Sequence, residues 1–248
     1  MRRGSRTGAR ARARGRAPAN ATAYSAIPWT WASSVWGFTT SWSGGSPGPR
    51  TGGALAQWQS VYDPYLAVGH EVVLIAPVPG LPDMVYTANA GFVIDGRALG
   101  VRFRVDERRG EERPFMDWFA AHGLDVVEPV AVQEGEGDFL LVGRTVLAGT
   151  GFRSTGDSHR EVAEVFGREV VSLRLVDPRF YHLDTAICVL DPVEGPGGVD
   201  AANIAYLPTA FDDASRRVLE ERYPDAIRVA DADGAAFGFT SGRPWLPM

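Results

Sequence analysis

A histidine and a carboxylate, His182 and Asp184, stand two residues apart just before the apolar run Ala186–Leu190. That run has the length and composition of a buried strand. Alternate side chains of a strand share a face, so we expect His182 and Asp184 to point the same way. A histidine beside a carboxylate can act as an acid or a base near neutral pH.

Polar residues also precede two earlier apolar runs. Asp83 and Asn89 come before Gly91–Ile94, and Glu134–Asp138, with acids at 134, 136 and 138, comes before Phe139–Val142. Each acid taken alone would be an ordinary hydrated turn residue. Three such groups in a repeated architecture predict one shared site, and several acids with one histidine suit recognition of a cationic group.

Metal and thiol chemistry receive less support from the sequence. The polar groups contain one histidine, with no His-x-x-x-His pair and no pair of cysteines, so we expect no metal. Cys188 is the only cysteine, which excludes an internal disulfide and suits a reducing cytoplasm. It lies in the middle of an apolar run, where we expect a small buried hydrophobic residue and no nucleophile.

The elements that must position these residues repeat along the chain. Each copy is an amphipathic helix, a glycine or proline stop, and a β-branched strand. The helix and strand of each copy are expected at 54–62 and 71–75, 115–121 and 124–127, 162–166 and 169–171, and 216–223 and 226–229.

Strand pairs lie between these copies. They are expected at 91–94 with 98–101, 139–142 with 145–148, and 186–190 with 204–207, the last pair joined through a Gly/Pro loop at 192–198. The turn Asp95-Gly96 is a strong hairpin signal. The repeating unit is therefore strand, strand, helix, strand, and such units should pack about a common axis where their polar strand starts converge.

The composition limits the classes of protein to which the chain can belong. The chain has 248 residues, of which 45% are hydrophobic, enough for an α/β domain with a sizeable core. No apolar run approaches the ~20 residues that span a bilayer. Eight arginines and no acid precede Asp63, so the remainder is strongly acidic, which argues against a nucleic-acid partner.

We expect three segments. Residues 1–53 are arginine-rich and then Gly/Pro/Ser-rich, which is typical of a disordered or non-native extension. Residues 54–238 should form the domain, and residues 239–248 an aberrant tail.

The ordered set of motifs Pro82–Asn89, Glu134–Asp138, Gly149–Arg153 and His182–Asp184 resembles that of the guanidino-group-modifying enzymes. The dimethylarginine dimethylaminohydrolase branch is the most similar, and its relatives include arginine deiminases and amidinotransferases. The resemblance implies the pentein fold, an α/β-propeller of five ββαβ modules about a pseudo-fivefold axis. It covers about residues 54 to 238.

The resemblance also implies residue roles. His182 matches the catalytic histidine, which protonates the leaving amine and then activates water. Glu134 matches the acid that grips the guanidinium nitrogens, with Glu136 as the alternative because the family's usual motif is one residue shorter.

Further positions match substrate-binding residues. Asp83 and Asp184 match binding acids, and Asn89 stands where many relatives carry aspartate. Arg153 and Arg104 match arginines that hold the substrate α-carboxylate, for which the bidentate guanidinium fork is the physical reason.

The family's nucleophile is a cysteine in the fifth module, and no cysteine follows Cys188 here. We therefore expect most of the fifth module and the nucleophile to be missing, and this polypeptide to be inactive or nearly so. Cys188 should not substitute, because six residues of one strand would separate it from His182 by about 20 Å.

The implied reaction is hydrolysis of methylated arginine, or arginine, to citrulline and an amine through a covalent cysteine intermediate, without a cofactor. An amidinotransferase, an arginine deiminase and a non-catalytic binder of arginine-like ligands are the alternatives. The expected partner is a small guanidino compound, and a homodimer is left open.

Overall fold

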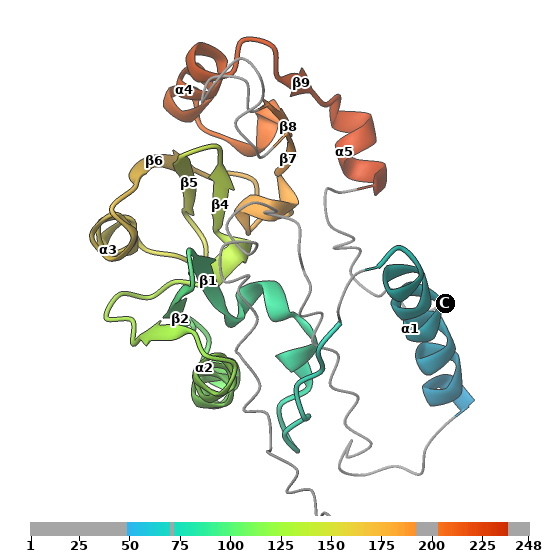
Figure 1. The fold of residues 1–248 in the computed structure, drawn as a ribbon. Helices are drawn as coiled ribbons and strands as arrows, with labels where there is room; N and C mark the ends of the chain where they lie inside the picture. The colour runs from blue at the N-terminus through green and yellow to red at the C-terminus, as the bar shows by residue number, and fades with distance from the viewer. Residues whose placement is uncertain (1–48, 70–71, 192–202, 238–248) are drawn as a thin grey trace, which may run out of the picture.

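The computed structural model of this chain describes residues 49–69, 72–191 and 203–237 (Figure 1). The described residues form a mixed α/β structure with three separate three-stranded sheets. In each sheet the first two strands form an antiparallel hairpin, and a third strand pairs parallel to the second after a helical crossover. This is the ββαβ unit that the sequence predicts, present three times.

The bounds of the units follow the expected pattern closely. The first unit is β1 Gly91–Ile94, β2 Arg97–Gly100, α2 Glu112–Ala121 and β3 Asp125–Val127. The second is β4 Phe139–Val142, β5 Thr145–Thr150, α3 Gly156–Phe166 and β6 Glu169–Arg174. The third is β7 Ile187–Asp191, β8 Asn203–Tyr206, α4 Asp213–Arg222 and β9 Ile227–Arg228.

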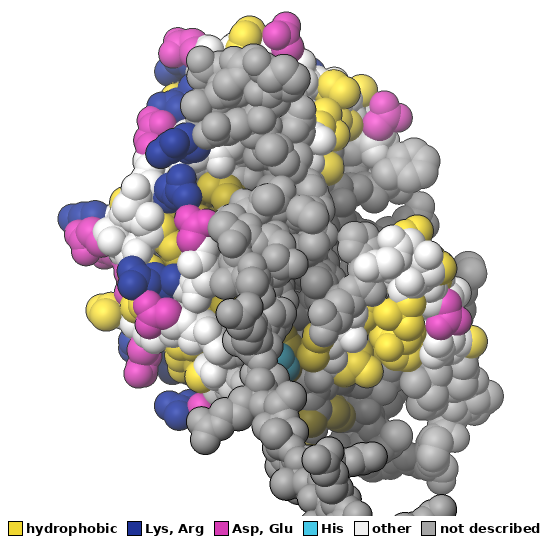
Figure 2. All heavy atoms as spheres, in the orientation of Figure 1, with side chains coloured by type: hydrophobic (Ala, Val, Ile, Leu, Met, Phe, Trp, Pro, Cys, Tyr) yellow, Lys and Arg dark blue, Asp and Glu magenta, His cyan; other side chains and the backbone are white. Residues whose placement is uncertain are grey.

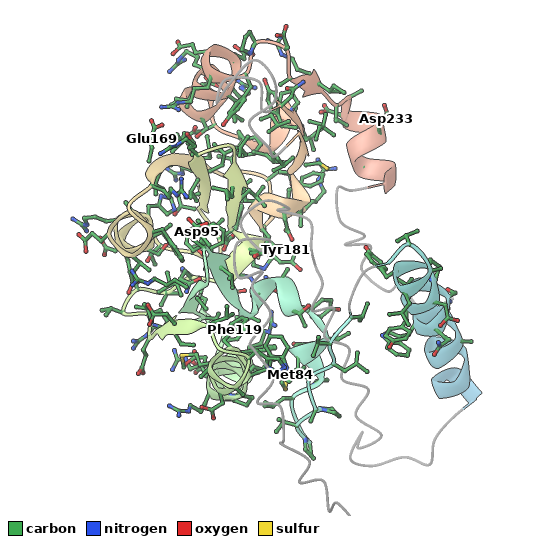
Figure 3. All side chains as sticks on the ribbon, in the orientation of Figure 1. Met84, Asp95, Phe119, Glu169, Tyr181 and Asp233 are labelled. Atoms are coloured by element: carbon green, nitrogen blue, oxygen red, sulfur yellow. The ribbon has the colours of Figure 1, made fainter. Side chains whose placement is uncertain are left out.

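Turn chemistry explains why the first hairpin is so well specified. Asp95 has φ of 51° and Gly96 φ of 81°, so both central residues occupy the left-handed region that a two-residue hairpin loop requires. Figure 3 shows Asp95 and Glu169 toward the outer side of the sheets and Tyr181 toward the inner side. The hairpin turn and the polar strand starts therefore lie at opposite ends of the units.

Helices α2, α3 and α4 lie along one side of the row of sheets (Figure 1). Acidic and basic side chains are interspersed over this side, at the left of the space-filling view in Figure 2. Three clusters of buried apolar residues fill the interior, the largest around β6, β7 and β8 with Leu173, Ile187 and Tyr206 at its centre. The units are thus held together by apolar packing in these three clusters.

A 3-10 turn precedes the first strand of every unit. These turns are η2 Thr87–Ala90, η4 Gly135–Gly137 and η5 Leu183–Thr185. The prediction that His182 and Asp184 lie in one continuous strand with Cys188 was therefore wrong. The chain turns after His182, and β7 begins only at Ile187, because a short turn lets the backbone fold back over the neighbouring unit.

Other expectations also need correction. The helix α1 spans Pro49–Ala67 and begins inside the segment assigned to the extension, and residues 72–75 of the expected strand 71–75 form no strand. A strand there has no described partner to pair with. The short turns η1 Pro82–Val85, η3 Asp106–Glu111 and η7 Pro208–Ala210 and the helix α5 Asp231–Phe237 complete the described elements.

No sheet among the described residues closes on itself, and three strand-bearing units are present there in place of five modules. The expected extension up to residue 48, the tail 239–248 and the loop 192–198 lie outside the described residues. Within the described part of the chain, no helix has the length and apolar character needed to cross a membrane.

Candidate active site

The site forms where the three 3-10 turns meet, because η4 contacts both η2 and η5. Asn89 lies in η2, Glu134 immediately precedes η4, Asp138 immediately follows it, and His182 immediately precedes η5. All four side chains are buried, with exposed fractions of 6% or less. The expected convergence of the polar strand starts is therefore present in the structure.

His182 lies between two carboxylates. Its Nδ1 is 3.1 Å from Oδ1 of Asp138, and its Nε2 is 3.3 Å from Oε2 of Glu134. Burial by itself lowers the pKa of His182, but the hydrogen bonds to Asp138 and Glu134 outweigh it and raise the pKa to about 9. The ring is therefore an imidazolium at neutral pH and can donate a proton.

Glu134 is fully buried and still ionised. Burial raises its pKa, but the hydrogen bond and charge of His182, followed by the charge of Arg153, lower it below the ordinary value. Its Oε1 accepts the Arg104 backbone N–H at 3.3 Å, and both oxygens accept from Nη1 of Arg153 at 3.4 Å. These bonds are long for a carboxylate that accepts charge-assisted bonds. The group therefore keeps capacity to bind another cation.

Asp138 holds the histidine ring in position. Its Oδ1 also accepts the Leu183 backbone N–H at 3.3 Å, and its Oδ2 accepts the Ser154 hydroxyl at 2.5 Å. The Ser154 hydroxyl oxygen in turn accepts the Glu134 backbone N–H at 3.1 Å. One serine thus connects the Asp138 carboxylate to the backbone of Glu134, the two residues that flank His182.

Two glycines explain the Glu-Gly-Glu-Gly-Asp sequence. Gly135 has φ of 57°, and a Cβ there would lie 2.5 Å from the Gly91 carbonyl oxygen. A Cβ on Gly137 would collide with the Asn89 amide nitrogen and lie 3.1 Å from Nδ1 of His182. Glycine is required at both positions so that η4 can approach η2 and η5.

Asn89 is oriented by a buried arginine. Nη1 of Arg108 donates to Oδ1 of Asn89 at 3.0 Å, which leaves the Asn89 amide nitrogen to donate to the Glu134 backbone carbonyl at 3.3 Å. The same nitrogen is 3.5 Å from Nε2 of His182, but an imidazolium has no lone pair to accept there.

Arg108 is itself held by Glu111. Nη2 of Arg108 lies 2.8 Å from a Glu111 oxygen, both side chains are buried, and the guanidinium carbon is 4.2 Å from the centre of the Phe103 ring. The Arg108 guanidinium also donates to the Asp83 backbone carbonyl at 3.1 Å. This pair fixes η2 and its Asn89 from the outside of the site.

Glu136 and Asp184 bring two more acidic side chains to η4 and η5. Burial and then the charge of Asp184 raise the pKa of Glu136 to about 8. Burial raises the pKa of Asp184 to about 7, with His182 opposing and the charge of Asp138 adding to the rise. Oδ1 of Asp184 is buried and has no hydrogen-bond partner within the described structure. This Asp184 oxygen can therefore accept a further hydrogen bond.

The structure brings some expected residues together and leaves others apart. His182, Glu134, Asn89 and Arg153 meet, whereas Arg104 contributes a backbone N–H and has an exposed side chain. Asp83 contributes its backbone carbonyl to Arg108. Among the described residues, no group of three side chains forms a metal-binding cluster.

Sequence reasoning missed Asp138, Ser154, Arg108 and Glu111 as members of the site. Asp138 stood inside a quoted motif but received no role. Arg108 and Glu111 belong to a run of six mostly charged residues, η3, that resembles an exposed surface turn. Their spacing of three residues within a 3-10 turn is the one signal that could have paired them.

Comparison with known proteins gives consistent relatives. The chain is 49% identical over 188 residues to the N(G),N(G)-dimethylarginine dimethylaminohydrolase of Mycobacterium tuberculosis, over 76% of this chain and 59% of that protein. It is 43% identical over 193 residues to the bifunctional arginine dihydrolase/ornithine cyclodeaminase AgrE of Nostoc, over 75% of this chain and 26% of that protein. No protein-family model matches the chain.

Solved structures agree with these relatives. The N-terminal domain of the cyanobacterial arginine dihydrolase ArgZ, a cysteine-to-serine variant bound to substrate, superposes with a TM-score of 0.68 at 41% identity, over 75% of this chain and 67% of that one. A dimethylarginine dimethylaminohydrolase from Pseudomonas aeruginosa in complex with citrulline gives a TM-score of 0.60 at 18% identity, over 75% of this chain and 69% of that one, and shares the fold. The chain spans about three fifths of the mycobacterial relative's length.

Proposed function

We propose a function for this chain from its family, because it belongs to the guanidino-group-modifying hydrolases that include dimethylarginine dimethylaminohydrolase and arginine dihydrolase, within the pentein superfamily. From this membership we propose that it binds the guanidinium group of arginine or methylated arginine at Glu134. The observation that carries the proposal is the fully buried, ionised Glu134 carboxylate beside His182, which the described residues hold by contacts of 3.3 to 3.4 Å.

The proposed chemistry follows from the protonation states of the site. A thiolate attacks the guanidinium carbon, the bond from that carbon to a terminal nitrogen breaks, and the leaving amine takes the proton that His182 holds. Water, deprotonated by His182, then adds to the same carbon, the carbon–sulfur bond breaks, and citrulline and the thiolate are released. An imidazolium with a pKa of about 9 suits the first, acidic step.

The described residues supply no thiolate beside His182. Cys188 is half-buried on β7, beyond η5 and Ala186, and burial raises the pKa of its thiol. A raised pKa disfavours the thiolate that covalent catalysis needs. We propose that these 248 residues bind and orient the guanidino group, and that turnover requires a thiolate they do not bring to His182.

The finer assignments of fold and partners are part of the same proposal. The three ββαβ units resemble consecutive modules of a five-module pentein ring, and the likeness to the ArgZ domain supports that arrangement. Amidino transfer in place of hydrolysis, a homodimer and a cytoplasmic location stay predictions. Binding of arginine by the AgrE relative favours arginine as a ligand as strongly as the mycobacterial relative favours its methylated form.

Calorimetry with L-arginine and dimethylarginine tests the proposal. Glu134→Gln should weaken binding by roughly 1–3 kcal/mol, the scale of a lost hydrogen bond to a charged group. Glu164→Gln on the exposed side of α3 is the matched control and should bind like the parent. Glu136→Gln shows whether the neighbouring acid is the true guanidinium ligand. If the parent binds neither compound, or Glu134→Gln binds both as well as the parent, the proposal is wrong.

A further inference from the structure

A second buried histidine, His159 on α3, takes no part in the site described above. Its Nε2 is 3.1 Å from the Gly149 carbonyl oxygen, and its Nδ1 is 2.7 Å from the Ser172 hydroxyl oxygen. A carbonyl oxygen can only accept, so Nε2 carries the proton and Nδ1 accepts from the Ser172 hydroxyl. Burial lowers the pKa of His159, which keeps the ring neutral at neutral pH.

The Gly149 carbonyl is available to His159 because a pair of ladder hydrogen bonds is only half formed there. The regular pairing of β4 with β5 starts just after Asp138 and stops just before Gly149. The Gly149 N–H still donates to the Asp138 carbonyl at 2.7 Å. In a regular antiparallel pair the Asp138 N–H would donate back to Gly149, but it donates to the Gly135 carbonyl at 3.0 Å, within η4. His159 thus supplies the donor that the ladder lacks.

This departure from the ladder carries Asp138 toward His182. Oδ1 of Asp138 accepts the Leu183 backbone N–H at 3.3 Å and lies 3.1 Å from Nδ1 of His182. The Gly149 backbone packs closely against the same turn, since a Cβ on Gly149 would lie 2.9 Å from the Cβ of Leu183. Gly149 is therefore the point at which α3, the start of β4 and η5 meet, and His159 holds it from α3.

We propose that His159 is a positioning residue for the site: by bonding the Gly149 carbonyl, it lets the chain leave β4 at Asp138 and direct that carboxylate at His182. The role of His182 as proton donor rests on the proposed function. Without a donor at position 159, the buried Gly149 carbonyl would compete for the Asp138 N–H, because a buried backbone acceptor left without a partner is costly. That bond would draw Asp138 out of the turn and back into the ladder.

Nuclear magnetic resonance of labelled imidazoles tests the inference first in the parent chain. At neutral pH, His159 should be neutral with its proton on Nε2, the tautomer that the Gly149 carbonyl requires. A proton on Nδ1 in the parent would overturn the inference without any substitution.

Substitution of His159 then tests its effect on His182. His159→Leu removes the donor and should lower the pKa of His182 from about 9 to about 8, because Asp138 no longer holds the ring as closely. His159→Gln, whose Nε2 can reach the same carbonyl, should keep the value of the parent. The titration follows the signal of folded molecules, so a loss of stability by itself does not produce this difference.

Two controls separate this bond from other effects. His122→Leu makes the same substitution at an exposed position after α2, and Ser172→Ala removes the partner of Nδ1 without removing the bond to Gly149. Both should titrate like the parent. An equal His182 pKa in His159→Leu and the parent overturns the inference, and the tautomer of the parent decides it if His159→Leu does not fold. No step needs a ligand, so failure of the parent to bind L-arginine overturns the proposed function alone.

Discussion

At the scale of single residues, the site consists of opposite charges placed out of reach of water. His182 is buried between Asp138 and Glu134, and each charge makes the ionised state of its neighbour more stable. Removing one member leaves the other buried charges without a partner. This destabilises the protein more than removing one member of an exposed ion pair would. The arrangement therefore depends on every member being present.

Asp138 should control the acidity of His182. Its hydrogen bond is the largest effect that raises the histidine pKa, so Asp138→Asn should lower that pKa from about 9 toward its ordinary range. Nuclear magnetic resonance titration of the labelled imidazole measures it. Glu134→Gln should lower the pKa less, and Asp157→Asn on the surface should leave it unchanged. A His182 pKa that stays near 9 in Asp138→Asn would show that the ring is held protonated by another group.

The residues that the sequence assigned to the site from a recognisable motif lie together in the structure, and their roles stay predictions. Glu134, Asn89, Arg153 and His182 meet as expected. Arg108 was missed because its partners, Asn89 and the Asp83 carbonyl, come from a segment about 20 residues earlier, and only the fold reveals that they meet. Charge in a polar run says nothing about burial until the element behind it is known.

At the scale of elements, the sequence predicts the hairpins but does not predict the 3-10 turns. The expected hairpins agree with the structure within two residues, because Asp95-Gly96 and Gly143 supply the positive φ angles that two-residue loops need. A 3-10 turn of three or four residues has no periodicity to detect. Its only sequence mark here is the glycine pair of η4, whose reason is a close approach to another unit.

Gly96 and Gly156 both have space for a side chain and differ in backbone conformation, so substitutions at the two positions measure the effect of backbone strain alone. A Cβ at either position would meet no atom within 4 Å, but only Gly96 has a positive φ, of 81°. Gly96→Ala should therefore lower the free energy of unfolding by about 1 kcal/mol, whereas Gly156→Ala at the start of α3 should leave it unchanged or raise it slightly. Urea denaturation measures both. Equal losses in the two variants would refute the hairpin geometry described for β1 and β2.

At the scale of the whole molecule, the buried charges link folding to pH. His182 has a pKa raised to about 9 from its ordinary 6.5, so the stability it contributes is present below pH 6.5 and lost as the pH rises through 9. Glu136 and Asp184, with pKa values raised to about 8 and about 7, favour the folded state when protonated and act in the same direction.

The free energy of unfolding should therefore fall between pH 6 and pH 9, with up to about 3 kcal/mol of the loss from His182. Chemical denaturation at several pH values measures it. Asp184→Asn should flatten the dependence, and Asp157→Asn on the surface should not. Stability that is constant or rises over this range would contradict the charge states described for the site.

A strand was predicted at 71–75, and residues 72–75 form none. This difference shows where a prediction from the local sequence pattern fails at this scale. Residues 72–75 have a strand-like composition, but in the described structure no neighbouring strand pairs with them. A strand exists only when a partner supplies its hydrogen bonds, and the sequence of the segment itself carries no record of that partner. The three units that did form strands contain both partners within their own hairpin.

The hydrogen bonds of the site join residues that are far apart along the chain. Asn89 and Glu134 are separated by 45 positions, and Asp138 and His182 by 44. Closing such loops costs chain entropy before any contact compensates for it, whereas each hairpin closes over a few residues. The order of folding follows: hairpins form early, the units dock afterwards, and the site is assembled last. A ligand that binds there therefore holds together three units that could otherwise open separately.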